Sequence, residues 1–264
     1  MIKTGADNLI NSSGKKERFG EIDSLRGIAI AMMVWFHLLF DLSYFGIMNI
    51  NVSTGFWRIF GYSTAILFVF IAGVSVFISS ERSKKYLSGL PYYLKFLKRG
   101  LFLFLIGEII TFATWVVIGG GYIVFGILHL LGLSIILSPF FMRFKKYNLV
   151  LGIIVISAGF FVSGIKGPLY LIPLGLTPYR FYSLDYEPLF PWFGVFLLGI
   201  SAGAFFYPNA KRRFNKIQLI QNSDNFHLIP IILEFPGKHS LIIYLIHQPL
   251  IILILSLAAG RILL

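Results

Sequence analysis

The sequence has no cysteine, which excludes disulfide frameworks, thiolate metal sites, iron–sulfur clusters and cysteine nucleophiles. Charge is also scarce, because only 13% of the 264 residues are Asp, Glu, Lys or Arg. That share is about half of what a soluble domain carries, and it excludes an ordinary cytosolic globular protein. In place of charge the chain has 57% hydrophobic and 17% aromatic residues. The composition therefore predicts an all-α protein that folds in a lipid bilayer.

Seven apolar stretches are long enough to cross a membrane. We expect transmembrane helices near residues 27–47, 59–79, 100–118, 122–141, 149–165, 189–207 and 240–259. The prediction is a single polytopic domain over 27–264, after a cytoplasmic segment, 1–26, that lacks the features of a signal peptide. Two shorter apolar runs, 168–176 and 228–235, adjoin prolines and are expected to lie at an interface or to fold back over a cavity.

Basic residues set the expected orientation. The connections on one side of the predicted spans hold nineteen Lys and Arg, whereas the other side holds only Arg58, Lys166, Arg180 and Arg261. By the positive-inside rule the N-terminus is cytoplasmic, and an odd number of spans places the C-terminus outside a plasma membrane. The net charge of +12 is thus explained by topology. No nucleic-acid partner is expected, since the basic residues lie in short loops beside apolar helices.

Polar residues inside predicted spans are the candidate functional residues, because an unpaired ionisable group in lipid is costly. They are His37 and Asp41 in the first span, Glu108 in the third, His129 in the fourth, and His247 and Gln248 in the seventh. His37 and Asp41 stand on one helix face, so the carboxylate is expected to orient the imidazole as a general base. Counted from the span ends, the ionisable groups fall near the midplane and predict one shared polar cavity. The alternative for Glu108, His129 and His247 is a purely structural role in packing and hydrogen bonding.

The cytoplasmic end of the first span offers a candidate phosphate site. Asp23 and Arg26 are three residues apart and can pair at the start of the helix. Arg26, together with Lys98 and Arg99 at the start of the third span, can bind phosphates of a cytosolic cofactor. The alternative is that Arg26 only anchors the span at the membrane surface. On the opposite side, the 165–188 connection is rich in Gly, Pro and Tyr and is a candidate lid or acceptor platform.

Five motifs carry a family resemblance. They are Glu21-Ile-Asp-Ser-Leu-Arg-Gly-Ile-Ala, Phe36-His-Leu-Leu-Phe-Asp41, Gly126-Ile-Leu-His129, Asp185-Tyr-Glu-Pro-Leu-Phe-Pro-Trp192 and Gly237-Lys-His-Ser-Leu-Ile-Ile-Tyr-Leu-Ile-His247-Gln-Pro. As a set they resemble the prokaryotic heparan-α-glucosaminide N-acetyltransferase-like proteins. The spacing from Arg26 to His37 also resembles that of membrane acyltransferases of the acyltransferase-3 type. In one departure, the lysosomal members have Asn at the position of His37 and a His in the first outer loop, where residues 48–58 here have none.

The resemblance implies a transmembrane acetyltransferase that passes acetyl from cytosolic acetyl-CoA to an amine or hydroxyl of a sugar or glycan outside. Acetyl-CoA is then the acyl donor, no metal is expected, membrane lipids surround the protein, and a homodimer is compatible with the glycine-bearing spans. The donor would be held by Asp23, Arg26, Lys98 and Arg99. His37 would act as base or as a transient acetyl carrier, with help from Asp41, Glu108, His129 and His247. The acceptor would be held by Arg180, Asp185, Glu187 and Gln248.

A second hypothesis uses the same polar residues for transport. A proton-coupled transporter or flippase of a sugar or lipid-linked sugar would employ them as a proton relay. It would move its substrate without consuming acetyl groups. A purely structural membrane protein is a third reading, and it leaves the ionisable residues within the spans unexplained.

Overall fold

The computed structural model describes residues 18–214, 228–260 and 262. Within these ranges the chain is helical, without strands, and six helices are long and apolar enough to cross a membrane. They are Gly20–Tyr44 (α1), Gly55–Ser83 (α2), Gly89–Ile118 (α3), Ile127–Val162, Leu189–Phe206 (α6) and Ser240–Ala259 (α9). The prediction of an all-α polytopic membrane protein is confirmed. Most of the predicted cytoplasmic segment, residues 1–17, and residues 215–227 lie outside the described ranges.

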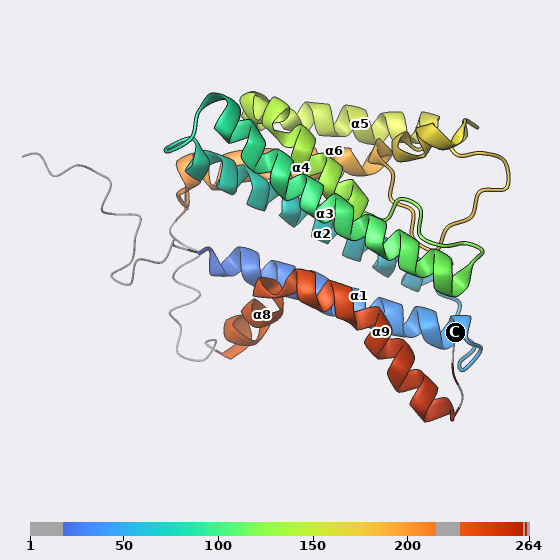
Figure 1. The fold of residues 1–264 in the computed structure, drawn as a ribbon. Coiled ribbons are helices and arrows are strands. Elements are labelled where there is room, and N and C mark those ends of the chain that lie inside the picture. The colour runs from blue at the N-terminus through green and yellow to red at the C-terminus, as the bar shows by residue number, and fades with distance from the viewer. Residues whose placement is uncertain (1–17, 215–227, 261, 263–264) are drawn as a thin grey trace, which may run out of the picture.

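The helical stretch Ile127–Val162 contains two of the predicted spans. It consists of α4 (Ile127–Phe141), the 3-10 helix η2 (Met142–Tyr147) and α5 (Asn148–Val162). Lys145 interrupts the helix with φ 44° and ψ −115°, and the Asn148 amide donates to the carbonyls of Phe141 and Lys145 across the turn. Figure 1 shows α4 running toward this turn and α5 returning from it. Ile127–Val162, one of the six membrane-spanning candidates of the described chain, therefore runs along the bundle twice, although α4 and α5, at 15 residues each, are individually short.

Several helix ends differ from the predicted spans. α3 begins at Gly89 rather than near residue 100, because the helix continues beyond the apolar stretch and carries Lys95, Lys98 and Arg99 on its first turns. α4 begins at Ile127 rather than near residue 122, since Gly119 and Gly121 take positive φ and turn the chain into a loop. The two short apolar runs form the 3-10 helix η3 (Leu169–Leu174) and the helix α8 (Leu228–Lys238).

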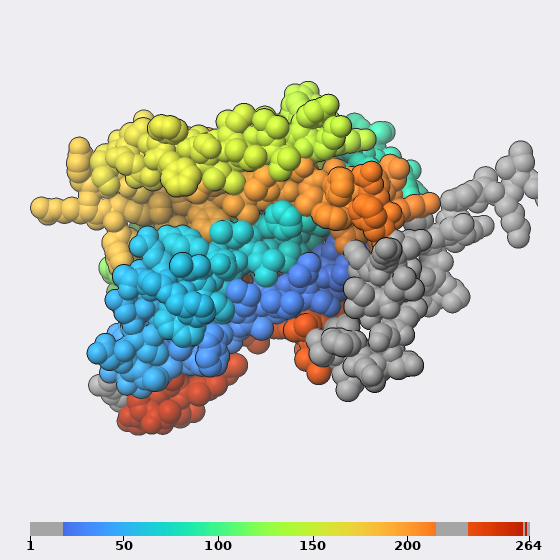
Figure 2. All heavy atoms as spheres, turned by 180° about the vertical axis from the view of Figure 1, so that it is seen from behind, coloured from blue at the N-terminus to red at the C-terminus, as the bar shows by residue number. Residues whose placement is uncertain are grey.

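Glycines allow α6 to pack closely against α2 and α5. A Cβ added at Gly73 of α2 would overlap the carbonyl oxygen of Phe196 on α6, and one added at Gly199 would overlap that of Phe70. α5 also lies close to α6, where Gly152 faces Gly194. Only small residues allow helix backbones in a membrane to approach in this way. Seen from behind in Figure 2, α5, α6, α2 and α1 follow one another as layers.

The remaining helices, α8 and α9, gather around α1. Gly27 of α1 lies against the Leu233 backbone of α8, and Gly237 lies against the Asp23 backbone. α9 follows the second half of α1 through an apolar cluster of Ile251 and Leu255 with Val34, Leu38, Leu42 and Phe45. α1 also packs on α2, and so it joins the two halves of the molecule.

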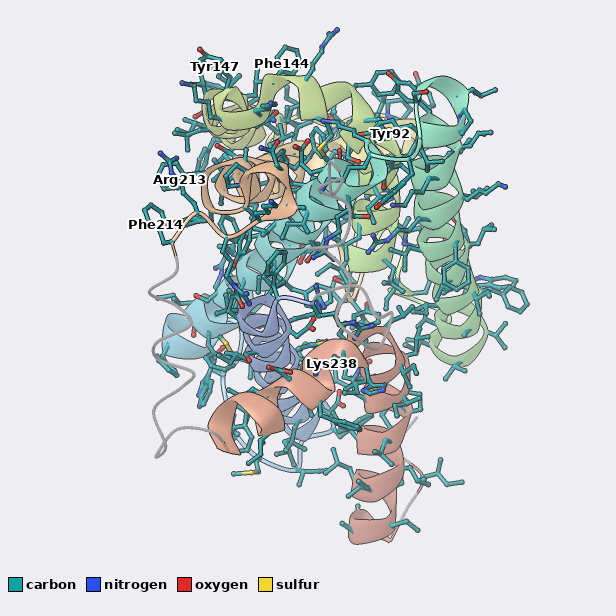
Figure 3. The ribbon with its side chains drawn as sticks, turned by 90° about the vertical axis from the view of Figure 1, so that its left-hand side faces the viewer. Tyr92, Phe144, Tyr147, Arg213, Phe214 and Lys238 are labelled. Carbon is teal, nitrogen blue, oxygen red and sulfur yellow. The ribbon has the colours of Figure 1, made fainter. Side chains whose placement is uncertain are left out.

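One end of the bundle carries most of the described basic residues, and we call it the basic end. It comprises the start of α1, the α2–α3 turn, η2 and the end of α6. Figure 3, which views this end, labels Phe144, Tyr147, Arg213 and Phe214 along one edge. The Arg213 guanidinium lies 5.8 Å from the centroid of the Phe214 ring. Aromatic and basic side chains paired in this way are typical of the membrane–water interface.

Candidate active site

A cavity of about 340 Å³ lies at the basic end, where α1, α2, α3 and α8 meet. Five cations line it, namely Arg18, Arg26, Arg82, Arg99 and Lys238, and Asp23 is its one lining carboxylate. We call this cavity the cationic mouth. Its excess of positive charge suits an anionic ligand such as a phosphate-bearing nucleotide.

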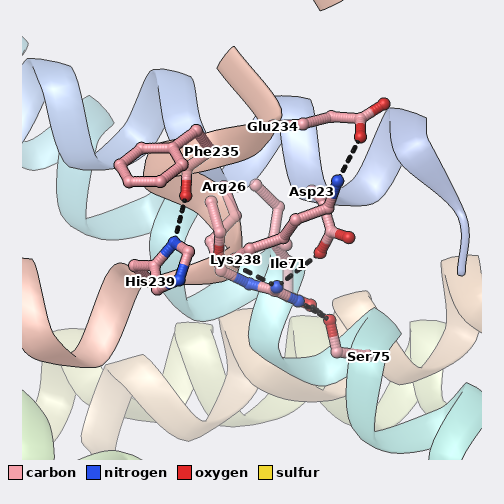
Figure 4. A network of polar contacts seen from close by, with 9 residues as sticks. Asp23, Arg26, Ile71, Ser75, Glu234, Phe235, Lys238 and His239 are labelled. Atoms are coloured by element: carbon pink, nitrogen blue, oxygen red, sulfur yellow. Dashed lines mark hydrogen bonds and ion pairs between the residues drawn. The ribbon is translucent and has the colours of Figure 1, made fainter. Parts of the chain in front are cut away.

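Arg26 is held at the centre of the mouth by a polar network (Figure 4). Its Nη1 donates to Asp23 Oδ1 at 2.8 Å and to the Gly237 carbonyl at 3.3 Å, and its Nη2 donates to Ser75 Oγ at 2.7 Å. The predicted Asp23–Arg26 pair is therefore present. The network also ties α1 to α2 and α8, so the guanidinium has a defined position beside the cavity.

A second cavity, of about 380 Å³, begins at Arg26, Ser75 and Arg99 and is otherwise lined mainly by apolar residues. We call it the inner cavity. It extends along α2, α3 and α4 and reaches Tyr244 on α9. Because three residues line both cavities, the cationic mouth leads directly into an apolar passage.

Lys98 does not take the place predicted for it. Its side chain is exposed, and it lines neither of the two cavities. The reason is helical geometry, since successive residues on a helix point about 100° apart and Arg99 faces the cavities. The sequence placed both cations together, whereas the structure brings only Arg99 to Arg26.

Two histidines meet one turn beyond Tyr244. The rings of His37 on α1 and His247 on α9 have centroids 4.8 Å apart, edge to face. His37 Nδ1 lies 2.9 Å from the Met33 carbonyl oxygen, and His247 Nδ1 lies 2.6 Å from that of Tyr244. A carbonyl oxygen can only accept, so each Nδ1 carries its hydrogen and each Nε2 keeps a lone pair. His247 Nε2 is buried without a partner, whereas His37 is partly exposed.

His37 and Asp41, both among the described residues, do not form the expected hydrogen bond. Asp41 instead accepts from the Gln248 amide, whose Nε2 lies 2.8 and 2.9 Å from the two carboxyl oxygens. His37 Nδ1 is already engaged by the Met33 carbonyl one turn earlier, and Asp41 turns toward α9. The Asp41–Gln248 contact therefore joins α9 to α1 next to the position where His247 meets His37.

Tyr244 is a site residue that the sequence reasoning missed. It lines the inner cavity, its carbonyl holds His247, and its ring centroid lies 5.6 Å from that of His247. The phenol is also close enough to Asp185 and Glu187 to interact with them electrostatically. A signal was available, because a residue three positions before His247 lies on nearly the same helix face.

Asp185 and Glu187, at the end of the bundle opposite the basic end, lie where the loop before α6 is hydrogen-bonded to the loop before α4. Leu184 N–H donates to Gly121 O, Glu187 N–H donates to Phe125 O, and Asp185 Oδ2 accepts from Ile127 N–H at the start of α4. Burial raises the pKa of Asp185 to about 6, even though the Ile127 N–H lowers it. Burial, with the nearby charge of Asp185, holds the pKa of Glu187 well above its usual range. Burial thus disfavours the ionised form of both carboxyls.

Arg180 is not brought to these carboxyls. It lies exposed on the loop before them, with φ 61°. Among the described residues, Arg180 makes no ion pair or hydrogen bond with Asp185 or Glu187. The acceptor role predicted for Arg180 therefore has no support from its geometry.

Glu108 and His129 form a separate pair between α3 and α4. Glu108 Oε1 lies 3.4 Å from His129 Nε2, and His129 Nδ1 accepts from the Gly126 N–H at 3.2 Å. The His129 ring stacks on Phe125, in the first turn of α4 rather than near its middle. Across the described residues no contact joins this pair to the two histidines above. The polar residues that the sequence placed in one shared cavity thus form two separate pairs, Glu108–His129 and His37–His247. His129 caps the start of α4.

Fold and site together define a polytopic helical membrane protein in which a cationic mouth leads into an apolar cavity that reaches Tyr244, whose carbonyl oxygen contacts His247. The chain belongs to a transmembrane acetyltransferase family. Residues 18–249 match the family model described as heparan-alpha-glucosaminide N-acetyltransferase, catalytic. No curated protein and no solved structure matches the chain.

Proposed function

We propose that this protein transfers an acetyl group from cytosolic acetyl-CoA to an amine or hydroxyl of a sugar or glycan on the other side of a plasma membrane. One observation carries the proposal: the cationic mouth and the inner cavity share Arg26, Ser75 and Arg99. A ligand that starts as an anionic nucleotide and continues as a slender arm fits this sequence of environments. Membership in an acetyltransferase family supports the same reaction.

In this proposal the phosphates of coenzyme A bind Arg26, Arg99 and Lys238 at the mouth. The pantetheine arm follows the inner cavity toward Tyr244. Along α1, the rise from Arg26 to His37 is about 16 Å, which is comparable with the length of that arm. The thioester then lies beside the histidine pair.

His37 is the proposed base, because its Nε2 has a lone pair and its side chain is partly exposed. It takes the proton from the acceptor N–H or O–H as the acceptor atom attacks the thioester carbonyl carbon. The carbon–sulfur bond breaks, and the leaving thiolate receives the proton from the imidazolium. His247 supports the ring of His37, and Asp185 and Glu187 hold polar groups of the acceptor.

The transport hypothesis has less support. A proton relay needs its members in sequence, but the Glu108–His129 pair makes no contact with the histidine pair in the described chain. A transporter would also be indifferent to acetyl-CoA. Binding of the donor therefore separates the two hypotheses.

The test compares two neighbouring cations that differ in position. Arg99→Ala removes a residue that lines both cavities, and Lys98→Ala removes the adjacent charge, which lines neither. By calorimetry on detergent-purified protein, Arg99→Ala is expected to weaken acetyl-CoA binding about tenfold or more, as for loss of a charged hydrogen bond. Lys98→Ala should stay within about twofold of wild type. Equal effects of the two variants, or no acetyl-CoA binding by folded wild type, would contradict the proposal.

A further inference from the structure

The inner cavity is bordered by two helices that do not pack together. Phe102 of α3 lines the cavity, and yet 58% of its surface is exposed. Within the described chain α3 packs mainly on α4, and α9 packs mainly on α1. Figure 1 shows α3 and α9 on the same face of the molecule. The cavity therefore opens between these helices toward the surface that faces lipid.

The walls along this opening are apolar. Phe102 and Leu103 come from α3 and Leu241 from α9, with Leu131 and Ile135 of α4 behind them. Charge in the inner cavity is confined to the basic end, at Arg26 and Arg99. A ligand that fills both regions has an anionic head and a hydrocarbon chain. Because the pantetheine arm occupies the length of the inner cavity in the proposed function, an acyl chain longer than acetyl would leave it sideways, through this apolar opening.

We propose that the donor site accepts acyl-CoA with chains longer than acetyl, the chain passing between α3 and α9 into the bilayer. This inference rests on the proposed function and extends its donor class. The chemical step is unchanged: the carbonyl carbon leaves sulfur and bonds to the acceptor atom, and the proton moves from the acceptor to the thiolate. Chain length acts on donor binding, because each methylene moved out of water strengthens binding about threefold to fourfold.

The experiment compares acetyl-CoA with octanoyl-CoA by calorimetry on the detergent-purified protein, below the micelle concentration of either thioester. Octanoyl-CoA is expected to bind at least tenfold more tightly. If acetyl-CoA binds and octanoyl-CoA binds no better, the inference fails while the proposed function stands. If neither thioester binds folded protein, the proposed function fails as well.

A matched pair of tryptophan variants tests the route of the chain. Leu241→Trp places a bulky ring in the opening, whereas Ile242 is 57% exposed, lies next to it on α9 and does not line the inner cavity. The ratio of octanoyl-CoA to acetyl-CoA affinity should fall at least tenfold in Leu241→Trp and stay at the wild-type value in Ile242→Trp. Equal ratios in both variants would overturn the route.

Contact with lipid at the opening is measured separately. Since the chain has no cysteine, Phe102→Cys gives a single site for a fluorescent label in protein reconstituted into vesicles. Nitroxide-bearing lipids should quench this label as strongly as one at Ile109→Cys, an exposed position further along α3. If the label at position 102 is not quenched while the label at position 109 is, the inference is overturned, because a second copy or another segment would then cover the opening.

Discussion

At the scale of the residue, hydrogen-bond direction separates the histidines into two kinds. His37 and His247 direct Nδ1–H at backbone carbonyls, which leaves Nε2 as a base. His129 accepts a backbone N–H at Nδ1, so its Nε2–H faces Glu108. The first arrangement suits proton abstraction and the second suits a fixed structural contact. Three histidines that look equivalent along the chain thus have different chemical capacities.

This difference predicts opposite phenotypes for two conservative variants. His37→Gln should lower acetyl transfer at least 100-fold, as for loss of a general base, while acetyl-CoA binding remains measurable. His129→Gln should retain transfer but lower the melting temperature, because it loses the ring stack on Phe125, while the Gln oxygen can still accept the Gly126 N–H. Both are measured by a radiolabelled acetyl assay and by thermal unfolding in detergent. Full acetyl transfer by the folded His37→Gln variant would exclude His37 as the base.

Asp185 predicts a pH-dependent stability. Its carboxyl has an ordinary pKa of 3.8 and, through burial, a folded pKa of about 6, so ionisation is costlier in the folded state. Asp185→Asn keeps an acceptor for Ile127 N–H and avoids that cost. Its stability advantage over wild type should grow from about pH 4 to about pH 6 and stay constant above. Melting temperatures across this range provide the measurement, and a pH-independent difference would refute the account.

At the scale of the helix, glycine contacts decide how closely the elements approach. Gly199 of α6 faces the backbone of α2 with no space for a Cβ, as does Gly27 of α1 against α8. These contacts hold α2 against the bundle and α8 beside the cationic mouth. The helices that carry the cationic mouth are therefore positioned by backbone contacts at glycines that do not themselves line the mouth.

Gly199→Ala is expected to destabilise the protein by about 1–3 kcal/mol, the usual cost of overpacking, because α6 must move away from α2. Gly164→Ala is its matched control, since a Cβ there meets no atom within 4 Å and the glycine has no positive φ. Thermal unfolding in detergent would report the two variants. An unchanged melting temperature in Gly199→Ala would show that the crossing tolerates a methyl group.

At the scale of the molecule, α5 runs the length of the bundle and places the η2 turn and the 163–188 loop at opposite ends. The positive-inside rule predicts that the basic end is cytoplasmic. A membrane-impermeant maleimide should therefore label Lys166→Cys in intact cells and Lys145→Cys only after permeabilisation. The reverse pattern would place the cationic mouth outside, away from cytosolic coenzyme A, and would contradict the proposed direction of transfer.

The sequence alone determined the properties that depend on composition and short spacing. Apolar stretches predicted the helical membrane fold, basic loops predicted the end with the cationic mouth, and a three-residue spacing predicted the Asp23–Arg26 pair. Tertiary structure decided what depends on how each helix is rotated. It turned Asp41 toward Gln248, set His247 against His37, chose Arg99 over Lys98, and brought Tyr244 to the inner cavity. Such contacts join residues up to about 200 positions apart, and only the packing of whole helices sets which faces meet.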